Sequence, residues 1–369
     1  MRILHTESSC GWGGQEIRIL EEAEGLARRG HDLLIATPPE SRLYSEAQKR
    51  GFAVRALPIA RKNFAGWRAL RILLKTETLD LVNTHSSTDS WLVALARIGL
   101  KGAPAVIRTR HISAPISNNF LTRWLYSRGA DHVVTTGEVL RRQVIERSGA
   151  DSSRVTSVPT GIDLGRFRPG DRAAARVRLG LPAEAFLVGI VATLRSWKGH
   201  LYLLDALARI PDSRVQAVVV GDGPMEQNIR RKAAEDGLAS RVIMAGHHDD
   251  VVPWLQSFDV FALPSYANEG VPQAIMQAMA CGLAVVTTGV GAIGEAAREG
   301  VTALMVRPRD AEALAAAISL LRDDPAQRAR LGAAAATEAR TRFSRDAMLD
   351  RMEAVFQSAL DESRGGPTP

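Results

Sequence analysis

The chain has 369 residues, of which 46% are hydrophobic and 24% charged, a composition typical of a globular protein with more than one core. Its two cysteines, Cys10 and Cys281, are too few for a disulfide framework and lack zinc-site spacing, so we expect a reducing compartment and no cysteine chemistry. The first residues hold no apolar run of signal-peptide length, and no stretch approaches the roughly 20 apolar residues of a membrane span.

The net charge of +7 is unevenly distributed along the chain. Residues 1–170 hold 25 Lys and Arg against 16 Asp and Glu, a net of +9, which leaves −2 for the remainder. Within this half, residues 51–130 hold twelve basic residues and only three acidic ones. A basic half of this kind indicates an anionic partner.

The first half of the chain alternates apolar runs with helical patterns. A strand predicted at 2–6 is followed by a glycine-rich turn and a helix that ends at Gly30. The other predicted strands of this half, each followed by a helical pattern, are 31–37, 79–85, 105–110 and 131–136. This alternation predicts a parallel sheet wrapped by helices.

The same pattern begins again after a cluster of prolines and glycines at 159–170. Short runs rich in Val and Ile predict further strands at 186–194, 215–223, 241–246, 259–265, 284–289 and 302–308. We therefore predict an α/β protein with one Rossmann-like, doubly wound domain at 1–167, a second at 168–344, and a helix at 345–362 that packs back on the first. Ligands of such domains bind at the carboxyl ends of the strands.

Two glycine-rich turns need separate interpretations. Residues 289–294, GVGAIG, satisfy the pattern of a dinucleotide site, but they come late in the domain and no strand ends in an acidic residue about 20 positions later. We favour a tight turn at this position over nicotinamide or flavin binding. Residues 11–16, GWGGQE, leave backbone N–H groups free at a helix start, which suits a phosphate or sugar oxygen.

Polar residues and glycines follow three strands of the second half. Arg195 and Lys198 come after the first strand and could neutralise two phosphates, although a solvated loop is the alternative. Gly221 and Gly223 end the next strand and would let a ligand approach the backbone. Glu269 opens a loop after a third strand, where its carboxylate can accept hydrogen bonds from hydroxyl groups while the following helix start faces an anion.

The order of the segments GGQE, NTHSS, TRH, PTGID, WKGH, GDGP and YANEGVPQAIMQAMACG resembles the family-four retaining glycosyltransferases, which have two Rossmann-like domains in the GT-B fold. The resemblance spans nearly the whole chain and is most specific at 262–300. It implies transfer of a sugar, with retained anomeric configuration, from a nucleotide-diphosphate sugar held mainly by the second domain to an acceptor held by the first. We expect a UDP-sugar, no metal and no other cofactor. Independently, the chain contains no Asp-x-Asp motif for a metal.

The resemblance also implies roles for residues of the second domain. Glu269 would contact the hydroxyls of the donor sugar, and the backbone of Gly270 and Val271 would approach the sugar and the diphosphate. Gln277 stands where a second glutamate usually holds the ribose. Lys198 matches the phosphate lysine. The arginine that usually precedes this lysine is replaced by a threonine, which leaves Arg195 as a substitute.

In the first domain the resemblance implies a catalytic role for His85, which matches a histidine close to the transferring sugar, alongside Glu269. Gly14 matches a glycine near the diphosphate. Arg110 and His111 are weaker matches and, with Glu16, are candidate contacts to the acceptor or the sugar. The residues alone leave a core or capping histidine open for His85.

The basic first half gives two candidate membrane contacts. Residues 61–75 and 120–128 combine aromatic, apolar and basic residues as an interfacial helix on anionic lipid does, and the alternative is a helix packed on its own sheet. Nucleic acid is not expected, because no binding module is present. We expect a cytoplasmic enzyme, peripheral on the cytoplasmic face of the inner membrane, with a lipid-linked glycan or glycolipid acceptor. The alternatives are a nucleotide-sugar epimerase or hydrolase, and a non-catalytic scaffold that binds nucleotide sugars.

Overall fold

The computed structural model describes residues 1–111 and 116–363, which form two compact units. The first unit is Met1–Gly161 together with the segment from Arg345, and the second is Ile162–Ser344. The second unit begins before the predicted residue 168. The reason is that Ile162 is buried in its core and pairs with Ser344 at its other end.

The first unit is built on a parallel sheet with the strand order β3-β2-β1-β4-β5-β6-β7. Its strands are β1 (Arg2–Thr6), β2 (Asp32–Thr37), β3 (Ala53–Ala56), β4 (Leu81–Thr84), β5 (Ala105–Arg110), β6 (His132–Thr135) and β7 (Val155–Ser157). The apolar runs predicted all of them except β3 and β7. These two short strands form the sheet's edges, and β3 is largely exposed, so neither needs a long apolar run.

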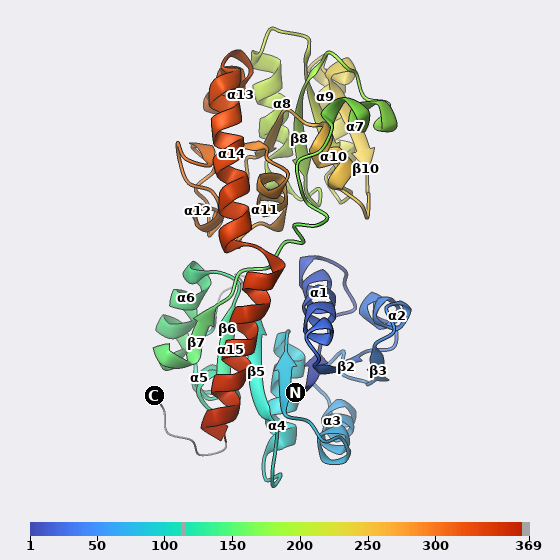
Figure 1. Ribbon diagram of the computed structural model, residues 1–369, viewed down its shortest axis with the longest axis vertical. Helices are drawn as coiled ribbons and strands as arrows, with labels where there is room; N and C mark the ends of the chain where they lie inside the picture. Colours follow the sequence, from blue (N-terminus) through green and yellow to red (C-terminus); the bar gives the residue numbers. More distant parts are fainter. Residues whose placement is uncertain (112–115, 364–369) are drawn as a thin grey trace. The chain divides into compact units, whose positions relative to one another are not determined.

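Helices cover both faces of this sheet. They are α1 (Gly14–Arg28), α2 (Arg42–Lys49), α3 (Phe64–Thr76), α4 (Ser87–Arg97), α5 (Phe120–Ser127), α6 (Glu138–Ser148) and α15 (Arg345–Ser363), with a short 3-10 helix, η1 (Ser152–Arg154). Because strand side chains alternate between faces, Ile3 enters a core with α1, α2 and α15, whereas Leu4 enters a core with α3, α4 and α6. Figure 1 shows α15, at the red end of the chain, lying along this sheet.

The second unit has a parallel sheet with the order β10-β9-β8-β11-β12-β13. Its strands, all predicted by apolar runs, are β8 (Phe186–Val191), β9 (Val215–Val220), β10 (Val242–Gly246), β11 (Val260–Leu263), β12 (Ala284–Thr288) and β13 (Ala303–Val306). Its helices are α7 (Arg172–Leu179), η2 (Ser196–Lys198), α8 (His200–Arg209), α9 (Glu226–Glu235), η3 (Ala239–Arg241), α10 (Val252–Ser257), α11 (Gln273–Ala280), α12 (Ile293–Ala296), α13 (Ala311–Asp323) and α14 (Pro325–Arg342). None of the helices described in either unit is long and apolar enough to span a bilayer.

Each sheet has one point at which the strand order reverses. It lies between β1 and β4 in the first unit and between β8 and β11 in the second. Ligands of open parallel sheets bind at the carboxyl ends of the strands at such a point. Gly14 follows β1, His85 follows β4, Lys198 follows β8 and Glu269 follows β11. Each of these residues therefore lies at the edge of its own sheet where a ligand is expected.

Candidate active site

Glu269, in the loop after β11, is nearly buried and forms an ion pair with Lys198. The Lys198 ammonium donates to the two carboxylate oxygens at 2.7 and 3.0 Å, and the Ser265 hydroxyl donates to one of them at 2.6 Å. The Lys198 side chain is 21% exposed and that of Glu269 only 4%. The structure thus joins two residues for which the family resemblance implies separate roles. The lysine is therefore the more exposed partner of the pair.

The turn at 289–294, which has the pattern of a dinucleotide site, contacts the backbone of Glu269. The Ala292 N–H donates to the Glu269 carbonyl oxygen at 3.1 Å. Gly291 has a φ of +62°, and a Cβ on it would lie 2.1 Å from the same oxygen. A glycine is therefore required here because the Glu269 loop approaches so closely. The turn acts as a support for that loop, in agreement with the interpretation favoured from the sequence.

The glycines after β9 also contact protein backbone. Gly221 has a φ of +137°, and a Cβ on it would lie 2.1 Å from the carbonyl oxygen of Ala192. A Cβ on Gly223 would lie 2.9 Å from backbone atoms of Leu194. Both partners belong to the loop after β8 that leads to Lys198. The need for glycine is thus explained by packing between two loops, whereas the sequence interpretation was close approach of a ligand.

The remaining predicted donor residues differ in their surroundings. Arg195 is exposed, with its guanidinium 5.9 Å from the Trp197 ring centroid, so it is held far less firmly than Lys198. At Gly270 an added Cβ would meet no atom within 4 Å, which leaves the backbone open to a ligand. Val271 is partly buried against the core of this unit, and Gln277 is partly exposed on α11.

In the first unit, three histidines form a hydrogen-bonded row, which we call the histidine row (His5, His85 and His111). Nδ1 of His5 lies 2.9 Å from Nε2 of His85, and Nδ1 of His85 lies 2.9 Å from Nε2 of His111. Both ring nitrogens of His85 are therefore occupied by neighbouring rings. No described residue bonds Nδ1 of His111, so His111 is the ring in this row with a nitrogen available to a ligand.

The other predicted residues of the first unit lie around the same edge of the sheet. Gly14 is the first residue of α1, and Glu16 is buried in the first turn of that helix. Arg110 donates to the Tyr126 hydroxyl at 3.0 Å. Their roles toward a ligand stay predictions.

Comparisons with known proteins identify the family of the chain. Residues 12–166 match the model of Glycosyltransferase Family 4, and residues 185–324 match that of Glycosyl transferases group 1. D-inositol 3-phosphate glycosyltransferases of Mycobacterium tuberculosis and Mycobacterium bovis are 30% identical over 388 residues, which cover 95% of this chain and 80% of each relative. The chain belongs to the family-4 glycosyltransferases.

Solved structures show the GT-B fold of this glycosyltransferase. A glycosyltransferase from Rickettsia africae has a TM-score of 0.88 and 21% identity, covering 97% of this chain and 98% of that one. HepE from Anabaena, solved in complex with UDP, has a TM-score of 0.86 and 22% identity, covering 97% of this chain and 100% of that one. The predicted fold and family are thus confirmed.

The three histidines of the row are held neutral. Burial lowers the pKa of His5 to about 4. Burial also lowers the pKa of His85 and of His111 well below 6.5, and the Arg18 guanidinium adds to both shifts. Arg18 itself is buried beside Glu22, with 3.5 Å between its Nε and the carboxylate. The histidine row is therefore uncharged at neutral pH.

Glu7, directly after β1, is a buried acidic residue that the motifs did not identify. Its carboxyl group accepts hydrogen bonds from the Ser9 N–H at 2.7 Å and from the Gln15 side-chain amide. Burial raises the pKa of Glu7 to about 8, and the neighbouring Asp89 carboxylate contributes. Asp89 is buried too and accepts from the His85 N–H at 2.9 Å. From the sequence, Glu7 could have been noticed as an acidic residue directly after β1. This strand lies next to the point at which the strand order reverses.

Replacing Glu7 with Gln should remove a pH dependence of stability. A carboxyl group with a pKa of about 8 when folded and 4.5 when unfolded binds more protons in the folded state between these values. The free energy of unfolding therefore falls as pH rises through this window. The buried histidines, whose pKa values are lowered, oppose this change, because their contribution to stability grows as pH rises through 6.5, but they do so equally in the wild type and in the variant. From pH 6.5 to 8 the free energy of unfolding of the wild type should therefore fall by about 2 kcal/mol relative to that of Glu7→Gln.

Urea unfolding followed by circular dichroism at the two pH values measures this difference. Glu146→Gln, which neutralises an exposed carboxylate on α6 of the same unit, should show the same change with pH as the wild type. An equal change in wild type and Glu7→Gln would contradict the shift assigned to Glu7.

Proposed function

We propose that this glycosyltransferase is retaining and metal-independent, and that it transfers a sugar from a UDP-sugar to a lipid-linked or cell-surface glycan of the polysaccharide or lipopolysaccharide type. The observation that carries the proposal is the buried ion pair of Lys198 and Glu269 at the carboxyl ends of the second sheet. It offers hydrogen-bond acceptors for sugar hydroxyls and a cation for phosphate in one place.

The similar proteins support a UDP-sugar as the donor. They point to two classes of acceptor, a lipopolysaccharide-type glycan and an inositol phosphate. HepE was solved with UDP-glucose as well as with UDP, and the lipopolysaccharide outer core galactosyltransferase WaaB shares the fold with a TM-score of 0.73 at 16% identity. The mycobacterial relatives are named for a phosphorylated inositol acceptor. A soluble inositol phosphate is therefore the second acceptor to test.

The second unit would divide the donor among its residues. Glu269 would accept hydrogen bonds from the sugar hydroxyls, and the open backbone at Gly270 would approach the sugar and diphosphate. The Lys198 ammonium has three N–H donors. Two of them bond the Glu269 carboxylate, and the third would bond a phosphate oxygen. Gln277 would hold the ribose. With no metal in the proposal, the lysine and the helix N-terminus neutralise the leaving diphosphate.

In the first unit, the contacts of His85 support a different role for this residue from the one that the resemblance implies. With both ring nitrogens bonded to other histidines, His85 holds His111 in place, and His111 would contact the ligand. The leaving diphosphate would accept the proton of the acceptor hydroxyl on the face that it leaves, so that configuration is retained. Positioning and electrostatic stabilisation would supply most of the rate.

Replacing Glu269 with Gln should lower kcat about 100-fold, because the site loses a charged acceptor and Lys198 loses its partner. Release of UDP from a panel of UDP-sugars, with a polyprenyl-linked glycan or an inositol phosphate as acceptor, measures the effect. Glu226→Gln, an exposed change on α9, is the matched control and should leave kcat unchanged.

The same assay separates the competing functions. UDP release that rises with an added acceptor identifies a transferase, and the acceptor that raises it identifies the class. Release that does not depend on any acceptor would indicate a hydrolase, whereas tight nucleotide binding without release would indicate a non-catalytic scaffold.

Replacing Gln277 with Glu should keep or tighten the binding of UDP. The substitution turns a neutral acceptor into a charged one, and charge-assisted hydrogen bonds to ribose hydroxyls are roughly twice as strong. Titration calorimetry with UDP measures the affinity. Gln227→Glu, the same change at an exposed position on α9, controls for the added negative charge. A large loss of affinity confined to Gln277→Glu would place this residue away from the ribose.

We also propose that the first unit binds an anionic membrane. Phe64 at the start of α3 is 72% exposed, and Phe120 at the start of α5 is 77% exposed. Between them, the Lys62 ammonium lies 5.6 Å from the Trp91 ring centroid, and Trp91 stacks on Trp124 at 5.7 Å. The two segments predicted to meet a membrane are therefore linked through α4 into one aromatic surface.

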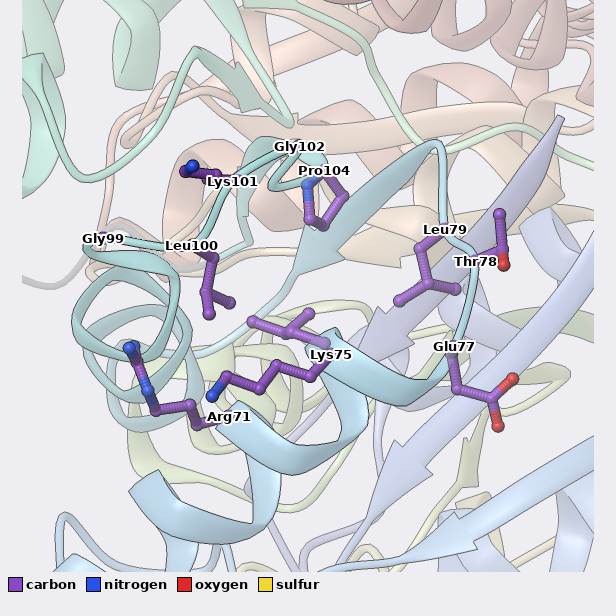
Figure 2. Close-up of a pocket in the computed structure, with 11 residues that line it drawn as sticks. Arg71, Lys75, Glu77, Thr78, Leu79, Gly99, Leu100, Lys101, Gly102 and Pro104 are labelled. Atoms are coloured by element: carbon purple, nitrogen blue, oxygen red, sulfur yellow. The ribbon is translucent and has the colours of Figure 1, made fainter.

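An apolar groove and a basic pocket lie next to each other on this surface. The groove, of about 740 Å³, runs between α3 and α4, and the pocket, of about 400 Å³, shares Arg71 with it. Figure 2 shows Arg71 and Lys75 reaching toward the same side of the pocket, whereas the Glu77 carboxylate points away from them. An apolar groove beside a pocket with cationic side chains suits an anionic lipid, which has acyl chains next to a negatively charged head group.

The acidic residues of this region are engaged elsewhere. Glu77 accepts hydrogen bonds from the guanidinium groups of Arg2 and Arg55, and Asp80 accepts from the Arg2 N–H at 2.7 Å. Asp89 is buried at the start of α4. Arg55 is thus paired with Glu77, whereas Arg61, Lys62 and Arg68 form no ion pair with a described acidic residue, which supports an anionic bilayer as their partner.

Neutralising Arg61, Lys62 and Arg68 to Gln should weaken binding to phosphatidylglycerol vesicles about 100-fold, at about 1 kcal/mol for each basic residue near the surface. Co-sedimentation measures the binding. Neutralising Arg209, Arg230 and Arg231 in the second unit gives the same change in net charge and should have little effect. Equal losses in the two triple variants, or no loss in either, would refute the membrane surface.

A further inference from the structure

We infer that the apolar groove and the basic pocket of the first unit together form a binding site for one molecule of an anionic phospholipid. The phosphate of its head group would lie in the pocket, and an acyl chain would lie along the groove. This site deepens the proposed membrane binding and rests on it for the source of the lipid, but it needs neither a sugar donor nor an acceptor.

The basic pocket carries three cationic side chains that have no acidic partner. It is lined by Arg71 and Lys75 from α3 and by Lys101 from the turn after α4. None of the three forms an ion pair with a described acidic residue. Figure 2 shows them on one side of the pocket and Glu77 on the other, where Arg2 and Arg55 bond its carboxylate. The pocket is therefore suited to an anion with several oxygen acceptors, such as a phosphate.

Arg71 joins the pocket to the groove, because it lines both. Its Nη1 donates to the carbonyl oxygens of Ala96 and Ile98 at 2.7 and 2.9 Å, and its guanidinium lies 5.7 Å from the Trp67 ring centroid. These contacts hold the guanidinium at the boundary between the two cavities. Its Nε and Nη2 donate to no described residue, so they are available to a phosphate oxygen.

The apolar groove extends from the start of α3 to the end of α4. From Phe64 to Arg71, α3 rises about 10 Å, and the opposite wall includes Leu95 and Ile98, which are 42% and 54% exposed. The two other large side chains of the groove are the rings of Trp67 and Trp91. An exposed apolar surface of this length marks an interaction site, and its narrow form suits a hydrocarbon chain.

A phospholipid satisfies both cavities at once. A neutral hydrocarbon would leave the cations of the pocket without a partner, and a free phosphate would leave the apolar side chains of the groove in water. A second copy of this chain, docked through the same face, would bring two basic surfaces together. The charge at one end and the apolar surface along the groove therefore favour a lipid over these three occupants.

The pocket lies at the opposite edge of the sheet from the candidate site. Its residues 77–79 precede β4 and its residues 99–104 precede β5, whereas His85 and His111 follow these two strands. Because β4 and β5 are parallel, their amino ends lie at one edge and their carboxyl ends at the other. A phosphate in the pocket is thus away from the reacting groups. For this reason we assign a phospholipid of the bilayer and not the lipid-linked acceptor.

Titration calorimetry with dioctanoyl phosphatidylglycerol, kept monomeric below its critical micelle concentration, tests the site without a bilayer. We expect the full-length protein to bind one molecule. Glycerol 1-phosphate, which lacks the acyl chains, and dioctanoyl phosphatidylcholine, which has a zwitterionic head group, should each bind at least tenfold more weakly.

Variants of the pocket test the head-group contacts. Lys75 and Lys101 are exposed, so the double variant Lys75→Gln, Lys101→Gln should fold normally. It should bind phosphatidylglycerol about 30-fold more weakly, because two cations near the phosphate are lost. The double variant Arg209→Gln, Arg231→Gln makes the same change in net charge on the second unit and should bind like the wild type.

A variant of the groove tests the acyl-chain contacts. Leu95→Gln places a polar group on the exposed wall of the groove and should weaken binding of phosphatidylglycerol about fivefold, with no effect on glycerol 1-phosphate. Leu320→Gln on α13 is the matched control, because Leu320 is 45% exposed and lies outside the groove. It should leave the affinity unchanged.

Four outcomes would overturn the site. Absence of binding excludes a lipid, equal affinity for glycerol 1-phosphate indicates a site for free phosphate, and equal affinity for phosphatidylcholine indicates a groove without a head-group pocket. A dimer in sedimentation that dissociates in Leu95→Gln would identify a second copy as the occupant. No donor, acceptor or vesicle is present, so each of these failures is distinct from a failure of transferase activity or of membrane binding.

Discussion

Parallel strand pairing is the constraint on which both half-sites depend. Every pair described in the two sheets is parallel, so each connection returns across the sheet and all carboxyl ends of a unit lie along one edge. Residues far apart in sequence are therefore brought together at this edge of the sheet. Lys198 and Glu269, which are 71 positions apart, form an ion pair for this reason. The reversal of strand order leaves room for a ligand at the same edge.

The interior strands and the fold class could be predicted from the sequence, because buried strands need apolar runs. The places of most candidate site residues, directly after these strands, could be predicted for the same reason. The edge strands β3 and β7 could not, because a short strand at an edge buries little. The glycines could be found from the sequence, and the structure adds a packing reason for them. A sequence shows that the chain needs a glycine at Gly221 but not whether a ligand or the loop at Ala192 comes close.

Charge at a buried site depends on partners that a sequence does not reveal. Glu7 and Glu269 both follow a strand near the reversal of strand order, and both are buried. Glu269 forms an ion pair with the Lys198 ammonium at 2.7 Å. Glu7 has amide donors and an acidic neighbour, so burial raises its pKa to about 8 and it is largely protonated at neutral pH. The same residue type thus supplies an anion in one unit and a neutral carboxyl group in the other.

The histidines show why position alone does not give a residue its role. His85 follows a central strand and matches a family position, yet a ring whose two nitrogens are both bonded to protein cannot bond a ligand without losing a partner. The free nitrogen belongs to His111, which motif matching ranked lower. His5 matched no motif, although it is the one polar residue within the apolar run before Thr6. The signal for His5 in the sequence was a polar side chain in a buried strand, on the same face of the sheet as the site. The role of each histidine follows only when the hydrogen-bond donors and acceptors of its ring are counted.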